Sequence, residues 1–411
     1  MKMHKPKLNE ERKTLVSNFV SLSLLQIAGY VFPLLTVPYL AHVIGVDRYG
    51  EIAFAAAVMV YFQTIVDYGF IFSAVRDIAR CRDDKEQVAS IYSNVMWSRI
   101  MLLFCSLCLL LLVIALVPKL FAMKWVLLAS FLMVVGHTFF PDWMFQAVEK
   151  MKYITIFNVV VKLLFTIAVF AFIHKPDDYI LQPVFTSLGY LISGVGAMWL
   201  IHSWGIRMQK PKLSLIIKSL KSNVDLFINQ LVPNLYNSAS VLLLGFFHGD
   251  AANGVFDAGN RFNTAGTSLL SILSRTFYPF LSRRMDKHEL YSRFNLCLSA
   301  FVSVSLFAAA PWIIDTFFPS DFDGAVAVLR ILSVSLFFLS LSNVYGTNYL
   351  ILKGHEREMR KITLYSSIIG LVVAIPATLY WSYFGVAVTI AFSRALIGIW
   401  SWLKAKSLKS R

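Results

Sequence analysis

Long runs of apolar residues are the feature that most constrains the fold of this chain. The first run covers residues 19–41 and the second covers residues 51–74, with a short turn at residues 45–50 between them. Each run exceeds the roughly 20 residues that an α-helix, rising about 1.5 Å per residue, needs to cross an apolar core about 30 Å thick. We therefore predict that residues 17–77 form a hairpin of two membrane-spanning helices.

Ten further apolar runs follow this hairpin, which gives twelve predicted spans in total. They cover residues 91–117, 125–145, 154–173, 179–201, 224–247, 255–280, 294–314, 325–352, 362–380 and 384–403. Of the 411 residues 57% are hydrophobic and only 15% are charged, whereas about a quarter of the residues of a soluble domain are charged. The sequence thus predicts an all-α polytopic membrane protein. We expect its net charge of +15 to reflect basic cytoplasmic loops rather than binding of nucleic acid.

Lys and Arg are distributed unevenly between alternate connections. If the N-terminus is inside, the cytoplasmic segments hold 28 of these residues and the outer turns hold 4. Because positive residues are retained in cytoplasmic loops, we predict that both termini are cytoplasmic.

The two halves of the chain share landmarks at an offset of 204 to 207 residues. Gly45 and Gly50 flank the first outer turn, and Gly249 and Gly254 flank the corresponding turn of the second half. An even number of spans per half keeps both halves in the same orientation. We therefore expect two pseudo-symmetric six-helix lobes, residues 1–202 and 222–411, joined by a basic cytoplasmic linker at residues 203–221.

Ionisable residues within the spans are candidates for function, because a charge is costly in the bilayer. Arg394 lies about ten residues from either end of its span, or roughly 15 Å from each surface, and Lys162 lies about 12 Å deep by the same measure. Arg275 and Arg330 are closer to a helix end, where a long side chain reaches water. The candidate cavity-lining cations are Arg394, Lys162, Arg261 and Arg99.

The acids of the spans have two interpretations. They can pair with the cations and hold helices together, or they can carry a coupling ion. The candidates are Asp67, Asp142, Asp225 and Asp257. Because cations outnumber the other charges deep in the spans, we expect an anionic cargo such as a phosphate, which Arg binds in a bidentate manner.

Prolines weaken the backbone hydrogen bonds of a helix. Pro33, Pro38 and Pro233 fall in the first helix of each half, where we expect a hinge or a side portal. The sequence has no nucleotide-binding loop, and we expect no metal site and no cofactor.

Several segments of the first 160 residues match a known pattern. They are PLLTVPYL at 33–40, DYGF at 67–70, SAVR at 73–76 and PDWMFQAVEKM at 141–151. With these segments the sequence resembles the Wzx-type O-antigen and polysaccharide-transport flippases, in the superfamily that includes the MATE exporters and the lipid II flippase. Ala147 departs from the pattern, since the family often has Gly there.

The resemblance implies a function and a location. The cargo would be an oligosaccharide repeat unit on undecaprenyl pyrophosphate, moved by alternating access from the cytoplasmic to the periplasmic leaflet of the bacterial inner membrane. The protein would be a transporter rather than an enzyme, and a polysaccharide polymerase and a chain-length regulator would be its partners.

Two alternatives stay open at this point. A MATE-like ion-coupled antiporter of small molecules has the same architecture, but the excess of cations in the spans disfavours it. A membrane polysaccharide polymerase or ligase would need a long outer loop to carry its reactive groups, and the outer turns here are short.

Overall fold

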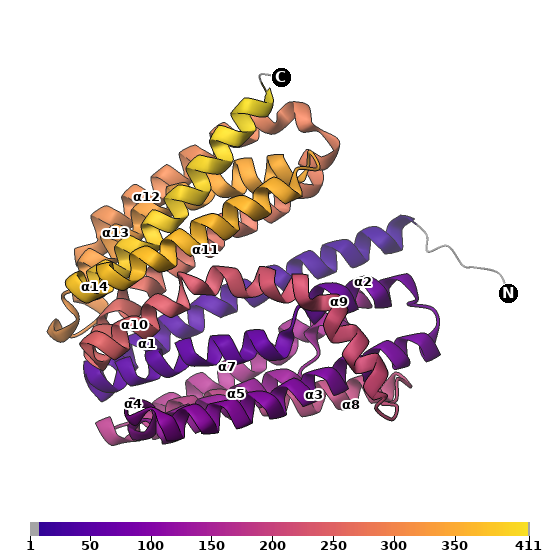
Figure 1. Cartoon of the computed structure of the whole chain (residues 1–411), viewed down its shortest axis with the longest axis horizontal. Coiled ribbons are helices and arrows are strands. Elements are labelled where there is room, and N and C mark those ends of the chain that lie inside the picture. The colour runs from indigo at the N-terminus through magenta and orange to yellow at the C-terminus, as the bar shows by residue number, and fades with distance from the viewer. Residues whose placement is uncertain (1–7, 410–411) are drawn as a thin grey trace. The chain divides into compact units, whose positions relative to one another are not determined.

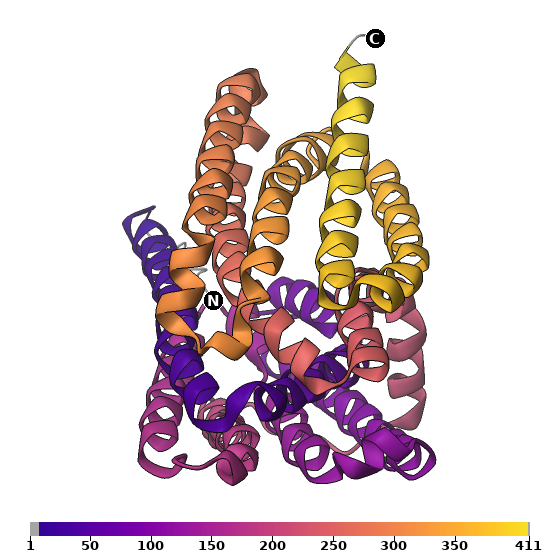
Figure 2. The same cartoon turned by 90° about the vertical axis from the view of Figure 1, so that its left-hand side faces the viewer.

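The structure is a computed structural model that describes residues 8–409, and every element in that range is a helix (Figures 1 and 2). In chain order the elements are α1 (Leu8–Asp67), α2 (Phe70–Arg80), α3 (Lys85–Leu116), α4 (Pro118–Ala122), α5 (Lys124–Phe139), α6 (Asp142–Ala147), α7 (Lys152–Phe172), η1 (Pro176–Ile180), α8 (Leu181–Ser203), α9 (Leu213–Leu231), η2 (Val232–Leu235), α10 (Ser238–His248), α11 (Asp250–Arg283), η3 (Met285–Lys287), α12 (His288–Phe317), η4 (Ser320–Phe322), α13 (Ala325–Leu341), η5 (Ser342–Ile351) and α14 (Glu356–Lys409).

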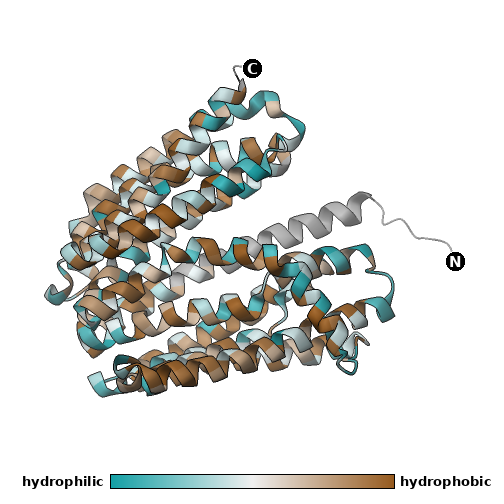
Figure 3. Ribbon diagram, in the orientation of Figure 1, coloured by the Kyte–Doolittle hydropathy of each residue, from teal (hydrophilic) through white to brown (hydrophobic). Residues whose placement is uncertain are grey.

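The lengths and hydropathy of these helices are those of membrane spans. Eight helical stretches within the described residues are long and apolar enough to cross a bilayer, and apolar residues dominate α3 and α5 in Figure 3. The predicted all-α class is confirmed. The count of twelve spans stays a prediction, although α1 and α14 have 60 and 54 residues. Each contains one non-helical residue, Gly45 or Ser382, at which two helices meet across a kink.

The chain forms two compact units, which we call unit 1 and unit 2. Unit 1 contains the chain up to Val43 and the segment Met59–Gln230, and unit 2 contains Ile44–Val58 and the chain from Leu231 onward. One stretch of α1 therefore belongs to unit 2, although the residues before and after it belong to unit 1. The expected lobes, 1–202 and 222–411, stay a prediction.

Unit 1 is held together by an aromatic and aliphatic core. Helix α5 packs on α8, α7 packs on α8, and α2 packs on α6. Short α6 contributes Trp143, Met144 and Phe145, which are at most 1% exposed and lie with Phe70 of α2 and Ile201 of α8 in one cluster. In a membrane protein such a cluster holds helices together mainly by close van der Waals packing.

The local course of the chain corrects four expectations. The expected turn at residues 45–50 reduces to Gly45, because the helix resumes directly after it. The second apolar run does not continue to residue 74: α1 ends at Asp67, and Tyr68 and Gly69 follow with φ of 42° and 76°. The connection between the runs 51–74 and 91–117 is also shorter than expected, since α2 continues to Arg80 and α3 begins at Lys85. The fourth run, 125–145, is interrupted between α5 and α6.

A close helix crossing lies at the start of unit 2. A Cβ atom at Gly50 would meet the Asp250 carbonyl oxygen at 1.7 Å, and a Cβ atom at Gly254 would meet the Val46 carbonyl oxygen at 2.5 Å. Gly254 lies 204 positions after Gly50, and Asp250 lies 204 positions after Val46, so the two contacts are reciprocal. Only glycine allows backbones to approach this closely.

The backbone repeats at the same offset elsewhere. Gly45 has φ 75° and ψ 171°, and Gly249 has φ 84° and ψ −175°. Lys150 N donates to Phe145 O at 2.8 Å, and His355 N donates to Leu350 O at 2.8 Å. These two helix ends share the bond that closes a Schellman motif, which is the similarity that an internal duplication requires.

Candidate functional site

Four charged or titratable side chains of unit 1 lie close together, and three of them, Asp67, His137 and Asp142, lie at or near helix ends. Asp67 is the last residue of α1 and Asp142 is the first residue of α6. Arg99 of α3 donates from Nη2 to Asp67 Oδ1 at 2.7 Å and to the His137 carbonyl oxygen at 3.2 Å. His137 Nδ1 lies 3.6 Å from Asp67 Oδ1. Asp142 Oδ1 accepts a hydrogen bond from Trp143 N at 2.8 Å, and Asp142 interacts electrostatically with His137, Arg99 and Asp67.

The burial of this group is uneven. The Arg99 side chain is 1% exposed, whereas those of Asp67 and His137 are 24% and 20% exposed. Arg99 Nε and Nη1 are buried without a hydrogen-bond partner among the described residues. A buried guanidinium needs an acid to offset its desolvation, and Asp67 supplies it. Arg99 is therefore compensated within the protein.

Lys162 occupies the inner face of α7. An α-helix turns about 100° per residue, so Lys162 shares a face with Thr155, Thr166 and Val169, which are at most 8% exposed. The large exposed residues of α7 lie on the opposite face: Ile156, Val160, Leu163, Leu164 and Ile167. A Cβ atom at Gly29 of α1 would lie 3.3 Å from Lys162 Nζ, so the ammonium group points toward α1. It forms no ion pair with any side chain that the structure describes.

Arg394 lies on an inner face of α14 in unit 2. It shares a face of α14 with Ile390 and Ser401, which are 3% and 0% exposed, opposite the exposed Phe392. Its Nη1 donates to Ser335 Oγ at 2.8 Å and to Asn263 Oδ1 at 3.4 Å. These partners are neutral, and no carboxylate of the described chain forms an ion pair with it. Arg394 thus keeps an uncompensated charge in a half-buried position.

The positive charge of Arg261, unlike that of Arg394, is neutralised by an acid. Its Nε donates to Asp257 Oδ2 at 2.8 Å, one turn earlier on α11. The same oxygen accepts a hydrogen bond from the Tyr49 hydroxyl at 2.6 Å. Tyr49 is 3% exposed and lies in the α1 stretch that belongs to unit 2. This group joins α1 to α11 within unit 2.

The remaining candidates lie apart from these groups. Asp225 is exposed on α9. Pro33 and Pro38 lie inside α1 without disturbing its helical backbone, and Pro233 lies in the 3-10 segment η2 between α9 and α10. Arg275 is exposed, and the guanidinium of Arg330 lies 5.4 Å from the ring centre of Phe307.

His137 and Tyr49 are not among the predicted site residues, because the predicted candidates are Lys, Arg, Asp and Pro residues within the spans. A search for His and Tyr beside a span acid would have found both. Among the described residues no group of three or more His, Cys, Asp or Glu side chains is arranged to hold a metal ion.

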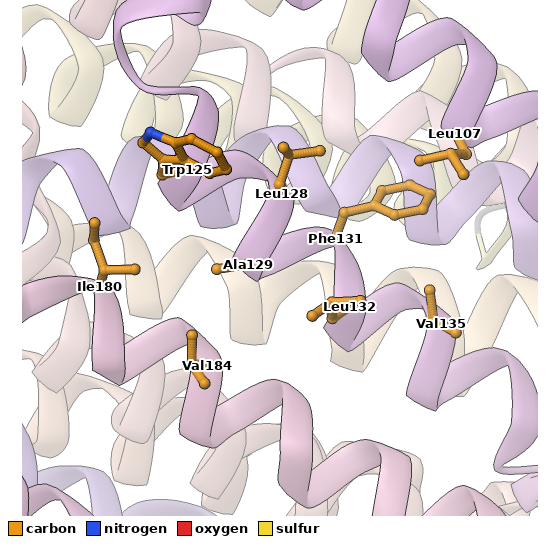
Figure 4. Close-up of a pocket in the computed structure, with 9 residues that line it drawn as sticks. All are labelled: Leu107, Trp125, Leu128, Ala129, Phe131, Leu132, Val135, Ile180 and Val184. Atoms are coloured by element: carbon orange, nitrogen blue, oxygen red, sulfur yellow. The ribbon is translucent and has the colours of Figure 1, made fainter.

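An apolar groove of about 530 Å³ lies on unit 1 between α3, α5 and α8 (Figure 4). Trp125, Leu128 and Leu132 of α5 form one side, and Ile180 and Val184 form another. Since its lining has no charged side chain, this groove cannot bind a diphosphate. It is suited to apolar chains.

The fold is that of a multi-spanning membrane protein. The structure is similar to that of a lipid II flippase, MurJ, in an inward closed conformation, with a TM-score of 0.74, 14% identity and coverage of 95% of this chain and 87% of that chain. It is also similar to an inward-facing multidrug resistance MATE family transporter of the MOP superfamily, with a TM-score of 0.70, 14% identity and coverage of 96% and 98%. At this identity the likeness shows the fold alone.

The sequence defines the family. Residues 15–285 match the family described as "Polysaccharide biosynthesis protein", and residues 290–408 match a second family of the same description. A protein of Escherichia coli (strain K12) named "Putative O-antigen transporter" is 30% identical over 400 residues, which cover 95% of this chain and 96% of that protein. The chain belongs to the polysaccharide biosynthesis protein family, to which the Wzx-type O-antigen transporters belong. The predicted resemblance is confirmed, and the protein is a transporter rather than an enzyme.

Proposed function

We propose that this protein moves an undecaprenyl-pyrophosphate-linked oligosaccharide, the repeat unit of O-antigen or a related surface polysaccharide, from the cytoplasmic to the periplasmic leaflet of the bacterial inner membrane. The relatives named as O-antigen transporters support the class of cargo. Transport proceeds by alternating access between two lobes with twelve spans in total and with both termini in the cytoplasm. The polyprenyl tail remains in lipid while the headgroup and sugars pass through the protein.

The observation that carries this proposal is the uncompensated charge of Arg394. Its hydrogen-bond partners among the described residues are the neutral Ser335 and Asn263. A guanidinium in a half-buried site attracts a diphosphate strongly, since charge-assisted bonds contribute about 1.5–3 kcal/mol. Lys162 supplies a second such charge in unit 1. Arg99 and Arg261, which are paired with acids, contribute less to binding of the cargo.

Deletion of the gene tests the proposed reaction. If the protein is a flippase, the complete lipid-linked repeat unit accumulates on the cytoplasmic face of the deletion strain. If it were a polymerase, single repeats would reach the cell surface unpolymerised. The polysaccharide polymerase and the chain-length regulator would act after this protein.

Complementation of the deletion strain tests the site. Arg394→Ala should lower surface polysaccharide by about tenfold or more at equal protein abundance, because 1.4 kcal/mol corresponds to a factor of ten. Arg293→Ala is the control, since Arg293 is exposed and pairs with Glu289 on the surface of α12. Wild-type export by the Arg394→Ala variant would refute the role of this residue.

A further inference from the structure

A lysine lies at one end of the apolar groove on unit 1. Lys124 is the first residue of α5, and Trp125, the next residue, lines the groove. The Lys124 Nζ atom lies 4.3 Å from the ring centre of Phe121 and 5.5 Å from that of Trp125, distances at which an ammonium group is attracted to an aromatic ring. It forms no ion pair with any side chain that the structure describes. The end of the groove at Trp125 therefore carries an unpaired positive charge.

The length of the groove matches one leaflet of a bilayer. Its lining on α5 runs from Trp125 to Val135, which at 1.5 Å per residue is about 15 Å. The apolar core of a bilayer is about 30 Å thick, so the groove extends through about half of it. Its volume of about 530 Å³ lies within the roughly 300–1,000 Å³ of small-molecule sites. A chain that fills the groove begins at the membrane surface and ends near the middle of the bilayer.

Trp125 marks the level of the lipid headgroups. Its side chain is 64% exposed, and an indole at the end of a membrane-spanning helix lies at the boundary between acyl chains and headgroups. Leu132, two turns further along α5, is also exposed and lines the groove (Figure 4). The wall of the groove thus changes from positively charged at the surface to apolar below it. An amphipathic lipid with a negative headgroup has the complementary polarity.

The acids near the groove lie on its other side. Ile180 lines the groove there, and Asp177 and Asp178 precede it in η1. Asp178 Oδ2 accepts hydrogen bonds from two backbone N–H groups just before η1, each at 3.0 Å. A negative headgroup is therefore expected at Lys124, on the α5 side, rather than beside η1.

We propose that this groove is a binding site for an anionic phospholipid, with one acyl chain along α5 and the phosphate at Lys124. The occupant is a membrane phospholipid rather than the polyprenyl tail of the cargo, because that tail is several times longer than the groove, whereas an acyl chain has the length of one leaflet. Van der Waals packing holds the chain, and the ammonium group provides the preference for a negative headgroup. The assignment to the periplasmic leaflet rests on the proposed cytoplasmic location of both termini, but the binding itself does not.

Quenching of Trp125 by brominated lipid tests the site. We would reconstitute the full-length protein in phosphatidylcholine vesicles with a rising fraction of phosphatidylglycerol whose brominated acyl chains quench a nearby indole. The Trp125 signal is the difference between the unmodified protein and Trp125→Phe. The reference is the Trp312 signal, obtained in the same way with Trp312→Phe, since Trp312 is 66% exposed on α12 and lies outside the groove.

The Trp125 signal should be half quenched at a brominated fraction about fivefold lower than the Trp312 signal, because one lysine at the surface contributes about that factor to the binding of an anionic lipid. Brominated phosphatidylcholine should show much less of this difference. Lys124→Ala should remove the preference for phosphatidylglycerol, and Lys124→Arg should retain it. Equal half-quenching fractions for Trp125 and Trp312 would overturn the proposal, and so would an unchanged preference in Lys124→Ala.

Two further arms test the groove and its occupant. Val184→Phe places a ring in the groove from α8 (Figure 4) and should raise the half-quenching fraction of Trp125 toward that of Trp312. An unchanged value in this variant would place the lipid outside the groove. If Val184→Phe fails to fold, Lys124→Ala still decides.

Undecaprenyl phosphate, added as a small fraction of the lipid, should leave the quenching of Trp125 unchanged. Relief of the quenching would show that the groove holds the polyprenyl tail of the cargo, which would overturn the proposal. These measurements follow lipid binding and not transport, so their outcome does not depend on the gene-deletion experiment.

Discussion

The four cations that the sequence placed deep in the spans have different partners in the structure. Arg99 pairs with Asp67 and Arg261 pairs with Asp257, whereas Lys162 and Arg394 have no acid partner among the described residues. Depth along a helix could be predicted from the sequence, because it follows from the rise per residue. The pairing could not, because Asp67 and Arg99 are 32 positions apart and meet only through helix packing.

Lys162 provides a direct test of the unpaired charges. Lys162→Ala should reduce export by roughly tenfold, because it removes a charge-assisted contact of about 1.5 kcal/mol or more. Lys162→Arg should retain much of the activity, since it keeps the positive charge. Surface polysaccharide is measured per amount of protein in the membrane. Lys152→Ala on the same helix is the control, because Lys152 is exposed, and equal loss in both variants would contradict the prediction.

The Asp67 and Arg99 pair should be structural as well as electrostatic. Asp67→Asn removes the ion-pair partner of a guanidinium that is 1% exposed, which should destabilise the protein by roughly 3–5 kcal/mol. Arg99→Met should cost less, because Asp67 is 24% exposed and can be hydrated. The double variant should be more stable than Asp67→Asn alone.

Thermal unfolding of the purified variants in detergent provides the measurement for this cycle. The interaction is the difference between the double variant and the sum of the single variants. Additive losses would show that the two side chains do not depend on each other in the folded state.

At the scale of elements, the crossing of α1 and α11 depends on the absence of a side chain at Gly50. Gly50→Ala should destabilise the protein strongly, since its Cβ atom would lie 1.7 Å from the Asp250 carbonyl oxygen and the backbone would have to move. Gly45→Ala is the matched variant: φ is 75° but no atom lies within 4 Å, so the cost should be only about 1–2 kcal/mol of backbone strain. The midpoint of thermal unfolding of each variant shows which of the two substitutions is more destabilising. A larger loss for Gly45→Ala would show that strain, rather than close approach, determines stability here.

Run lengths predicted the helical class but not where helices stop. The run 51–74 reads as one segment, because Tyr68 is compatible with a helix and its left-handed conformation, φ 42°, comes from the tertiary structure. Pro141 offered a signal for the interruption before α6, since the residue before a proline disfavours helix. The repeated glycines Gly45 and Gly249 were predicted from their offset alone, and the structure gives both the same backbone conformation.

At the scale of the whole molecule, the chain passes from one unit to the other three times. The passages fall after Val43, after Val58 and after Gln230. The first is one residue before the non-helical Gly45, and the third is just before η2 with Pro233. The passage after Val58 has no such interruption, because Gly45 is the only non-helical residue inside α1.

Alternating access requires movement between the units. The continuous helix after Gly45 determines which contact must break during that movement. Residues 46–67 form one helix, so the stretch up to Val58 should follow the rest of α1 and separate from α11. A cleavable thiol cross-linker between Tyr49→Cys and Asp257→Cys should therefore stop export, and a reducing agent should restore it. The Tyr49 hydroxyl donates to Asp257 Oδ2 at 2.6 Å, so the two positions face each other across α1 and α11. The background has Cys81, Cys105, Cys108 and Cys297 replaced by Ser, and each single-cysteine variant serves as a control. Normal export by the cross-linked protein would mean that α1 bends at Val58 and that the crossing stays closed throughout the cycle.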